Sequence, residues 1–144
     1  MIIYMTTEMV IHTHAKTVEL SGGGTVGRLD EGKLESILTH IQNDDYYPNF
    51  CDKLTHLFFS ICQFHCFEDG NKRLALSASL QFLLLNGYYH CTKYFMPNME
   101  MICLKVASGK IDKPLLREIL ESHIDGTFEE NESLKLKIIH ALTD

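Results

Sequence analysis

Residues 54–85 read LTHLFFSICQFHCFEDGNKRLALSASLQFLLL, two apolar runs separated by a short polar stretch. The first run repeats apolar residues at i, i+3, i+4 and i+7, which predicts an amphipathic helix over about 51–64. The second run, residues 72–86, is apolar on nearly every face and predicts a helix buried at the centre of a bundle, with Gly87 as its C-terminal stop. We therefore expect an all-α fold built around the second run.

Further helices are predicted on both sides of this pair. Apolar residues at the same spacing predict a helix from Glu31 with Asp30 as its N-cap. Pro97 and Pro114 suit the first turns of helices over 97–108 and 112–123, and an apolar stripe after Glu129 predicts a last helix. Asp125-Gly126-Thr127 predicts a turn. Residues 1–28 are ambiguous: segments 18–20 and 25–28, on either side of glycines, would form a small β-flap.

The length of 144 residues fits one domain, 1–144, with a core over about 8–124 and a helical tail over about 128–142. The net charge of -6 argues against direct binding of nucleic acid. No run is long and apolar enough for a membrane span, so no membrane partner is expected. The five cysteines and the absence of a signal-peptide pattern favour reduced thiols and a cytoplasmic location.

The polar stretch between the two apolar runs, residues 65–73, reads HCFEDGNKR. It ends at the start of the buried helix, where unpaired backbone N–H groups and the helix dipole favour an anion. Gly70 permits close approach of a ligand, and the next three residues add donors, which predicts a phosphate site made by Gly70, Asn71, Lys72 and Arg73. Asp69 is a candidate Mg²⁺ ligand and His65 a candidate base. These are the parts that phosphoryl or nucleotidyl transfer needs.

Each of these residues also has a structural interpretation. His65 continues an apolar stripe and is then a core histidine, whereas Asp69 is then only a helix cap. Gly70-Asn71 is then an ordinary turn, and the two cations after it form a solvated first turn. Two cations at the positive end of a helix are unfavourable, however, and an anionic ligand would remove that conflict.

Two other functions remain open from the residues alone. A zinc site would use the cluster Cys62, His65, Cys66, His90 and Cys91, although the spacing matches no usual zinc knuckle. Cys66 as a nucleophile has no further support. A non-catalytic helical module that binds a nucleotide or a partner is the second rival, but pure binding does not require a base such as His65.

The nine residues 65–73 resemble the signature of the Fic/Doc family, His-x-Phe-x-(Asp/Glu)-Gly-Asn-x-Arg, at every fixed position. The resemblance implies a Fic-like helical bundle with a glycine-rich flap, and a transferase that uses ATP or another nucleoside triphosphate with Mg²⁺. It implies that His65 deprotonates a hydroxyl of a target protein, Asp69 binds Mg²⁺, Gly70 and Asn71 form the anion nest, and Arg73 holds a phosphate. The flap that aligns the target would comprise Gly22, Gly23, Gly24, Thr25, Val26 and Gly27.

Two positions indicate the subfamily. Lys72 stands where AMP-transferring members usually have glycine, and Leu76 stands where they place a second arginine. Both departures resemble the death-on-curing (Doc) toxins, which phosphorylate a translation elongation factor and are controlled by a separate antitoxin. The resemblance therefore favours a Doc-like kinase toxin, with AMP transfer as the alternative. Gly70 differs from the alanine that those toxins often have.

Overall fold

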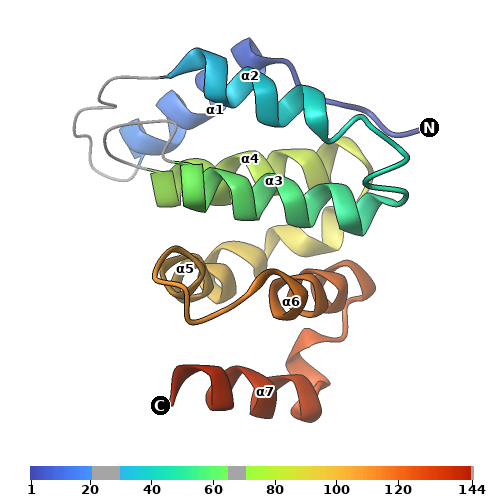
Figure 1. Cartoon of the computed structure of the whole chain (residues 1–144), viewed down its shortest axis with the longest axis vertical. Helices are drawn as coiled ribbons and strands as arrows, with labels where there is room; N and C mark the ends of the chain where they lie inside the picture. Colours follow the sequence, from blue (N-terminus) through green and yellow to red (C-terminus); the bar gives the residue numbers. More distant parts are fainter. Residues whose placement is uncertain (21–29, 65–70, 144) are drawn as a thin grey trace.

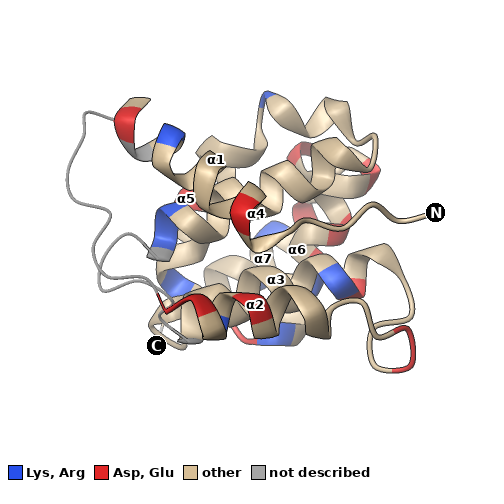
Figure 2. Ribbon diagram, turned by 90° about the horizontal axis from the view of Figure 1, so that it is seen from above, with Lys and Arg blue, Asp and Glu red and all other residues tan. Residues whose placement is uncertain are grey.

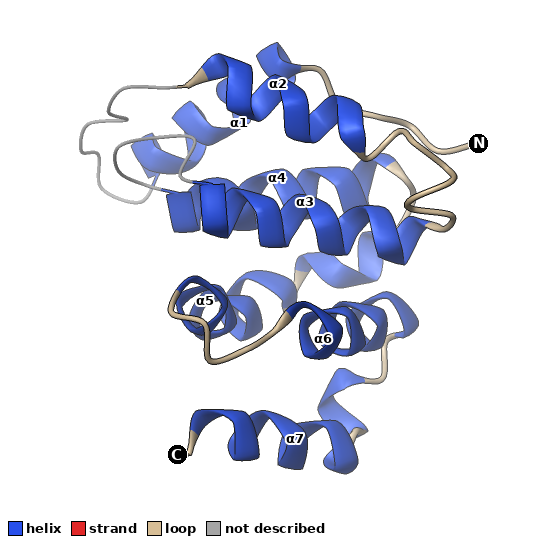
Figure 3. Cartoon of the chain, viewed as in Figure 1, coloured by secondary structure: helices blue, strands red, loops and turns tan. Residues whose placement is uncertain are grey.

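The computed structural model describes residues 1–20, 30–64 and 71–143 of the chain. These ranges contain α-helices and two short 3-10 helices and no strand, which confirms the all-α prediction (Figure 3). The elements, in chain order, are α1 (Thr7–Leu20), α2 (Glu31–His40), α3 (Phe50–Phe64), α4 (Asn71–Leu85), η1 (Tyr89–Thr92), α5 (Phe95–Ala107), α6 (Lys113–Asp125), η2 (Phe128–Glu130) and α7 (Glu132–Leu142).

The helices lie in successive layers along the long axis of the molecule (Figure 1). The pair α1 and α2 forms the first layer and α3 with α4 the second, followed by α5 with α6 and then α7. The core runs through these layers as one continuous cluster of buried apolar side chains. Acidic and basic residues are interspersed over the helices (Figure 2). None of the helices in the described ranges is long and apolar enough to cross a membrane.

Helix α4 is the buried centre that its composition predicts. Leu74, Ala75, Ala78, Phe82 and Leu83 are all completely buried. The ring of Phe82 stacks with that of Phe50 at a centroid distance of 4.7 Å. The centroid of the Tyr4 ring lies 6.2 Å from that of Phe82. Each large apolar side chain buried in this way contributes about 1.5–3 kcal/mol. Packing on several sides therefore fixes the position of α4 and of its first turn.

The helix ends follow the predicted capping signals. The Asp30 carboxylate accepts a hydrogen bond from the Lys33 backbone N–H at 3.0 Å, which caps α2. Gly87 has φ 89°, and the Tyr88 N–H donates to the Leu83 carbonyl at 3.0 Å, so the chain leaves α4 through a left-handed turn. Gly126, with φ 73°, ends α6 in the same way and confirms the predicted turn.

The N-terminal region differs from the sequence-based prediction. Residues 18–20, which we expected in a β-flap, belong to the last turn of α1, so this part of the prediction is wrong. The rest of the predicted flap, including Gly22–Gly27 and residues 25–28, lies outside the described residues. The sequence did not predict helix α1. Its completely buried positions Val10 and His14 have the spacing i and i+4 of a helix face, but one of them is a histidine. A buried histidine breaks the apolar stripe by which a helix is recognised in sequence.

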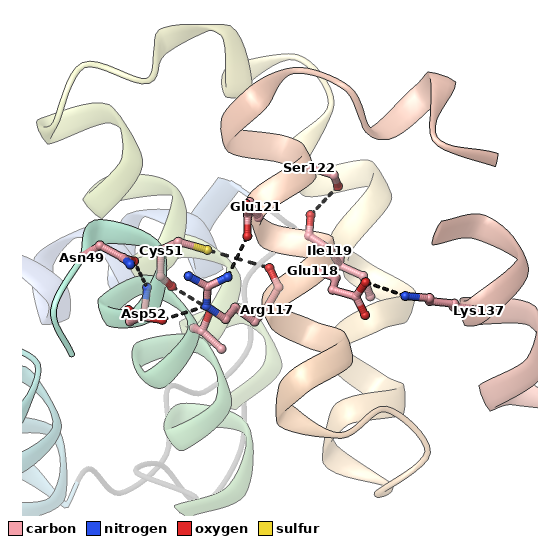
Figure 4. A network of polar contacts seen from close by, with 10 residues as sticks. Asn49, Cys51, Asp52, Arg117, Glu118, Ile119, Glu121, Ser122 and Lys137 are labelled. Atoms are coloured by element: carbon pink, nitrogen blue, oxygen red, sulfur yellow. Dashed lines mark hydrogen bonds and ion pairs between the residues drawn. The ribbon is translucent and has the colours of Figure 1, made fainter. Parts of the chain in front are cut away.

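Ion pairs connect the layers at their edges. Arg117 on α6 contacts Asp52 on α3 at 2.7 Å and Glu121 on its own helix at 2.6 Å (Figure 4). Lys137 on α7 contacts Glu118 on α6 at 2.7 Å. These pairs are partly exposed, and such pairs contribute about 0–1 kcal/mol each. They orient α3, α6 and α7, whereas the apolar core supplies most of the stability.

Lys53 on α3 is completely buried, which is rare for a lysine. Its ammonium donates to the Ile41 carbonyl at 2.9 Å and to the Asp44 carboxylate at 2.7 Å, and it lies 5.6 Å from the centroid of the Tyr4 ring. Burial lowers the pKa of Lys53, but the hydrogen bonds to Asp44 and Tyr4 outweigh it and raise the pKa overall. The charged ammonium therefore holds the segment that joins α2 to α3.

His123 on α6 predicts a pH dependence of stability. The side chain is 5% exposed, its ring stacks on Phe128 at 4.5 Å, and burial lowers its pKa to about 4 although Glu129 acts in the opposite direction. Because the unfolded histidine binds a proton near pH 6.5, stability falls as pH decreases from 6.5 through 4. The loss from this residue amounts to about 3 kcal/mol.

Urea unfolding at several pH values measures this loss. In His123→Phe we expect a smaller decrease in the free energy of unfolding between pH 6.5 and pH 4, because the ionisable group is gone. The exposed His140 on α7 supplies the control His140→Phe, which should keep the parental pH profile. Identical profiles for the His123 variant and the parent would contradict this assignment.

Candidate active site

The predicted site lies at the junction of α3 and α4. Helix α3 ends at Phe64 and α4 begins at Asn71, while His65, Asp69 and Gly70 lie outside the described residues. The C-terminal ends of α1 and α3 and the N-terminal ends of α2 and α4 lie on the same side of the molecule (Figures 1 and 2). The structure therefore brings together the helix ends that flank both predicted segments, the flap and the motif.

The first turn of α4 presents the predicted cations to solvent. Asn71 is the first residue of the helix, and the side chains of Lys72 and Arg73 are exposed. This first turn carries no acidic residue. Two cations therefore stand at the positive end of a helix dipole, in a turn without an acidic residue, which favours an anionic ligand at this point.

His14 on α1 is a residue of this region that the sequence did not reveal. It is completely buried, and its pKa is lowered first by burial and then by the positive charge of Arg73. Burial, and after it the charge of Arg73, both favour the neutral form of the imidazole. Helix α1 thus contributes a buried imidazole whose pKa responds to the charge of Arg73 on α4.

Helix α5 supports the junction from the opposite side. The Cys103 thiol donates to the Lys72 carbonyl at 3.7 Å, and its Sγ lies 3.3 Å from that of Cys62 on α3. The Gln63 side-chain amide donates to the Val106 carbonyl at 2.8 Å. These contacts fix the last turn of α3 and the first turn of α4 to the same helix, which positions the two ends of the motif.

The same contacts bear on the zinc alternative. The hydrogen bond with Cys103 and burial raise the pKa of Cys62, so this thiol stays protonated, whereas zinc binds thiolates. Burial also raises the pKa of Cys91 to about 11. In the described part of the chain, no group of three or more histidine, cysteine or acidic side chains is arranged to hold a metal. His65 and Cys66, the other members of the predicted cluster, lie outside that part.

Leu76 occupies a buried position one turn further along α4. Its side chain is 6% exposed and belongs to the apolar core. Because position 76 is a leucine and not an arginine, this position offers no charge to an anion. The cations at the start of α4 are Lys72 and Arg73. This arrangement distinguishes the chain from a site with a second arginine.

A cavity of about 810 Å³ opens beside the end of α3. Its volume lies within the range of small-molecule sites. Residues from α2 and α3 line it: Gly32, Lys33, Ser36, Ile37, His40, His56 and Gln63. Gln63 lies in the last turn of α3, two positions before His65 in the sequence, so the cavity extends to the end of this helix.

The comparison with known proteins agrees with the motif. The model of the Fic/DOC family matches residues 4–83, which is more than half of the chain and includes the whole motif. The chain belongs to the Fic/Doc family. The matched residues cover α1 to most of α4, the helices that surround the junction.

Two curated relatives belong to the Doc branch of this family. The chain is 31% identical over 94 residues to "Toxin Doc" of Mycolicibacterium smegmatis, which covers 62% of this chain and 72% of the relative. It is 31% identical over 93 residues to "Protein kinase doc" of Escherichia phage P1, with 62% of this chain and 71% of the relative covered. The predicted family resemblance is therefore confirmed.

Proposed function

We propose that this chain is a Doc-like toxin that transfers the γ-phosphate of ATP to a hydroxyl side chain of a target protein. The observation that carries this proposal is the first turn of α4, where exposed Lys72 and Arg73 precede Leu76 in the core. AMP-transferring members of the family usually have a glycine where this chain has Lys72, and they place a second arginine where it has Leu76. The names of the two relatives, a toxin and a protein kinase, point in the same direction.

The reaction assigns a task to each motif residue. The target hydroxyl oxygen attacks the γ-phosphorus, the bond to the ADP oxygen breaks, and His65 accepts the hydroxyl proton. Gly70 and Asn71 at the start of α4, with Lys72 and Arg73, would hold the phosphates through backbone N–H groups and positive charge. Asp69 would bind Mg²⁺, which neutralises charge on the phosphate oxygens when it is bound.

The remaining parts of the proposal concern partners. The flap residues Gly22–Gly27 would align a segment of the target, for which a translation elongation factor is the family expectation. A separate antitoxin would control the activity, as expected of a Doc system. A kinase of this kind would work in the cytoplasm, where ATP is available and the buried cysteines Cys51, Cys62, Cys91 and Cys103 remain free thiols.

The position of the transferred label tests the donor chemistry. The protein is incubated with a bacterial lysate and Mg²⁺, in parallel with ATP labelled at the γ- or the α-phosphate. We expect a protein band labelled only from the γ position. Label only from the α position would replace the kinase by AMP transfer, and bound nucleotide without either label would indicate a binding module.

A further inference from the structure

A second group of polar side chains converges beside the cavity. His40 comes from α2, Tyr47 from the segment before α3, His56 from α3 and Lys113 from the start of α6. The Lys113 ammonium and the Tyr47 hydroxyl each lie 3.0 Å from His56 Nδ1. His40 Nδ1 lies 3.1 Å from the Tyr47 hydroxyl and 3.4 Å from His56 Nε2. Four separate segments therefore meet in one cluster.

This cluster lies away from the end of α3, the helix that precedes the motif in the sequence. His56 precedes Phe64, the last residue of α3, by eight positions, which corresponds to about 12 Å along the helix. His40 and His56 both line the cavity of about 810 Å³, and Lys113 contacts His56 directly. None of the described residues that line this cavity is acidic, although the whole chain carries a net charge of -6. The described lining thus offers one lysine and two imidazoles and no carboxylate of its own.

Lys113 has no carboxylate partner in the described part of the chain, where the ion pairs involve other lysines and Arg117. Its ammonium lies 5.6 Å from the ring centroids of both Tyr47 and Phe59. Burial lowers the pKa of Lys113, whereas the charge of Asp52 raises it. Asp52 itself is paired with Arg117, so the positive charge of Lys113 is only partly compensated.

Two other carboxylates stand near the cluster. Asp112 caps α6 by accepting the Leu115 N–H at 3.0 Å, and Glu35 lines an adjoining hollow that also includes His40. Lys113 is the first residue of α6, where the helix dipole adds further positive potential. The cluster therefore combines the ammonium charge of Lys113 with several hydrogen-bond donors.

The hydrogen bonds determine how the imidazoles are protonated. Because Lys113 donates to His56 Nδ1, a neutral His56 carries its proton on Nε2, which faces His40 Nδ1. Burial, Lys113 and His40 together lower the pKa of His56 to about 4. An anion bound beside these groups, on their cavity side, would stabilise the protonated form and reverse this shift.

We propose that His40, His56 and Lys113 form a second oxyanion site, distinct from the motif, which binds a phosphate group. A phosphate dianion offers oxygens to several donors at once, and the Tyr47 and Ser60 hydroxyls lie beside the imidazoles as additional donors. A metal ion fits less well, because the Lys113 ammonium at 3.0 Å from His56 would repel it. The source of the phosphate is either the free ion or a phosphorylated side chain.

Histidine titration by NMR tests this site without any transfer assay. The resonances of His40 and His56 are assigned with His40→Gln and His56→Gln, and their pKa values are measured at constant ionic strength in chloride and in inorganic phosphate. We expect inorganic phosphate to raise the pKa of His56 by about one unit. Lys113→Gln should weaken phosphate binding about tenfold. O-Phosphoserine in a third titration separates the two sources, because a phosphorylated side chain should then bind more tightly than the free ion.

Lys93 provides the matched control, because its ammonium also lies over a tyrosine ring, 5.2 Å from the centroid of Tyr94, without a histidine contact in the described residues. Lys93→Gln should bind phosphate as the parent does. Thermal unfolding checks that each variant folds, and His40→Gln, at an exposed position, gives an independent loss of binding. The proposal is overturned if phosphate leaves both pKa values unchanged, if Lys113→Gln and Lys93→Gln bind equally well, or if Zn²⁺ and not phosphate perturbs the two histidines.

Discussion

Replacement of His65 by alanine is expected to reduce phosphate transfer to the target by about 10²- to 10⁴-fold, the usual contribution of a general base. The loss should appear in the rate of labelling from γ-labelled ATP at saturating nucleotide. Nucleotide binding should change little, because the phosphate contacts are assigned to the first turn of α4 and not to the imidazole. The affinity for ATP, measured separately by calorimetry, distinguishes a lost base from a lost binding site.

His140→Ala is the matched control for this experiment, since it removes an exposed imidazole from α7. It should label the target at the parental rate. An unchanged rate in His65→Ala would refute the role of His65 as the base, whatever the transferred group is. A loss of ATP affinity as large as the loss of rate would instead assign the imidazole to nucleotide binding.

Truncation of Phe82 to alanine is expected to give the largest loss of stability. The side chain is completely buried in α4 and packs between rings from the N-terminal segment and α3. Removing a buried phenylalanine costs about 3–5 kcal/mol, a large part of the roughly 5–15 kcal/mol that holds a domain together. The midpoint of thermal unfolding should fall by roughly 10 °C.

Tyr89→Ala is the corresponding control, because Tyr89 is an aromatic residue that is 71% exposed. Its effect on the free energy of unfolding should stay within about 0.5 kcal/mol. Urea unfolding of both variants gives the comparison. Similar free energies of unfolding for the two variants would mean that α4 is not the centre of the core.

The sequence predicted the helices whose buried residues are apolar and regularly spaced. Leu34, Ile37 and Leu38 on α2, and the buried faces of α3 and α4, lie where the spacing indicated. Asp30 and Gly87 marked the helix ends because their roles depend on local backbone geometry. These features are local, so a single sequence is sufficient to identify them.

Other features depend on residues that are distant in the chain. The contact between Cys62 and Cys103, the burial of Lys53, and the meeting of His56 with Lys113 arise only when separate helices pack. The sequence also gave no reason to select His14, because a histidine within a weakly apolar segment looks like a surface residue. For the motif itself, sequence supplied the residue types, and the structure added the helix ends that flank them.

The buried ammonium of Lys53 has a practical consequence for chemical labelling. An amine-acylating reagent applied to the folded protein should react with the exposed lysines and spare this one, whose nitrogen is enclosed by Ile41, Asp44 and Tyr4. Acylation there would occur only in molecules whose link between α2 and α3 has opened. Mass spectrometry of that single amine would therefore count the opened molecules in a sample that is otherwise folded.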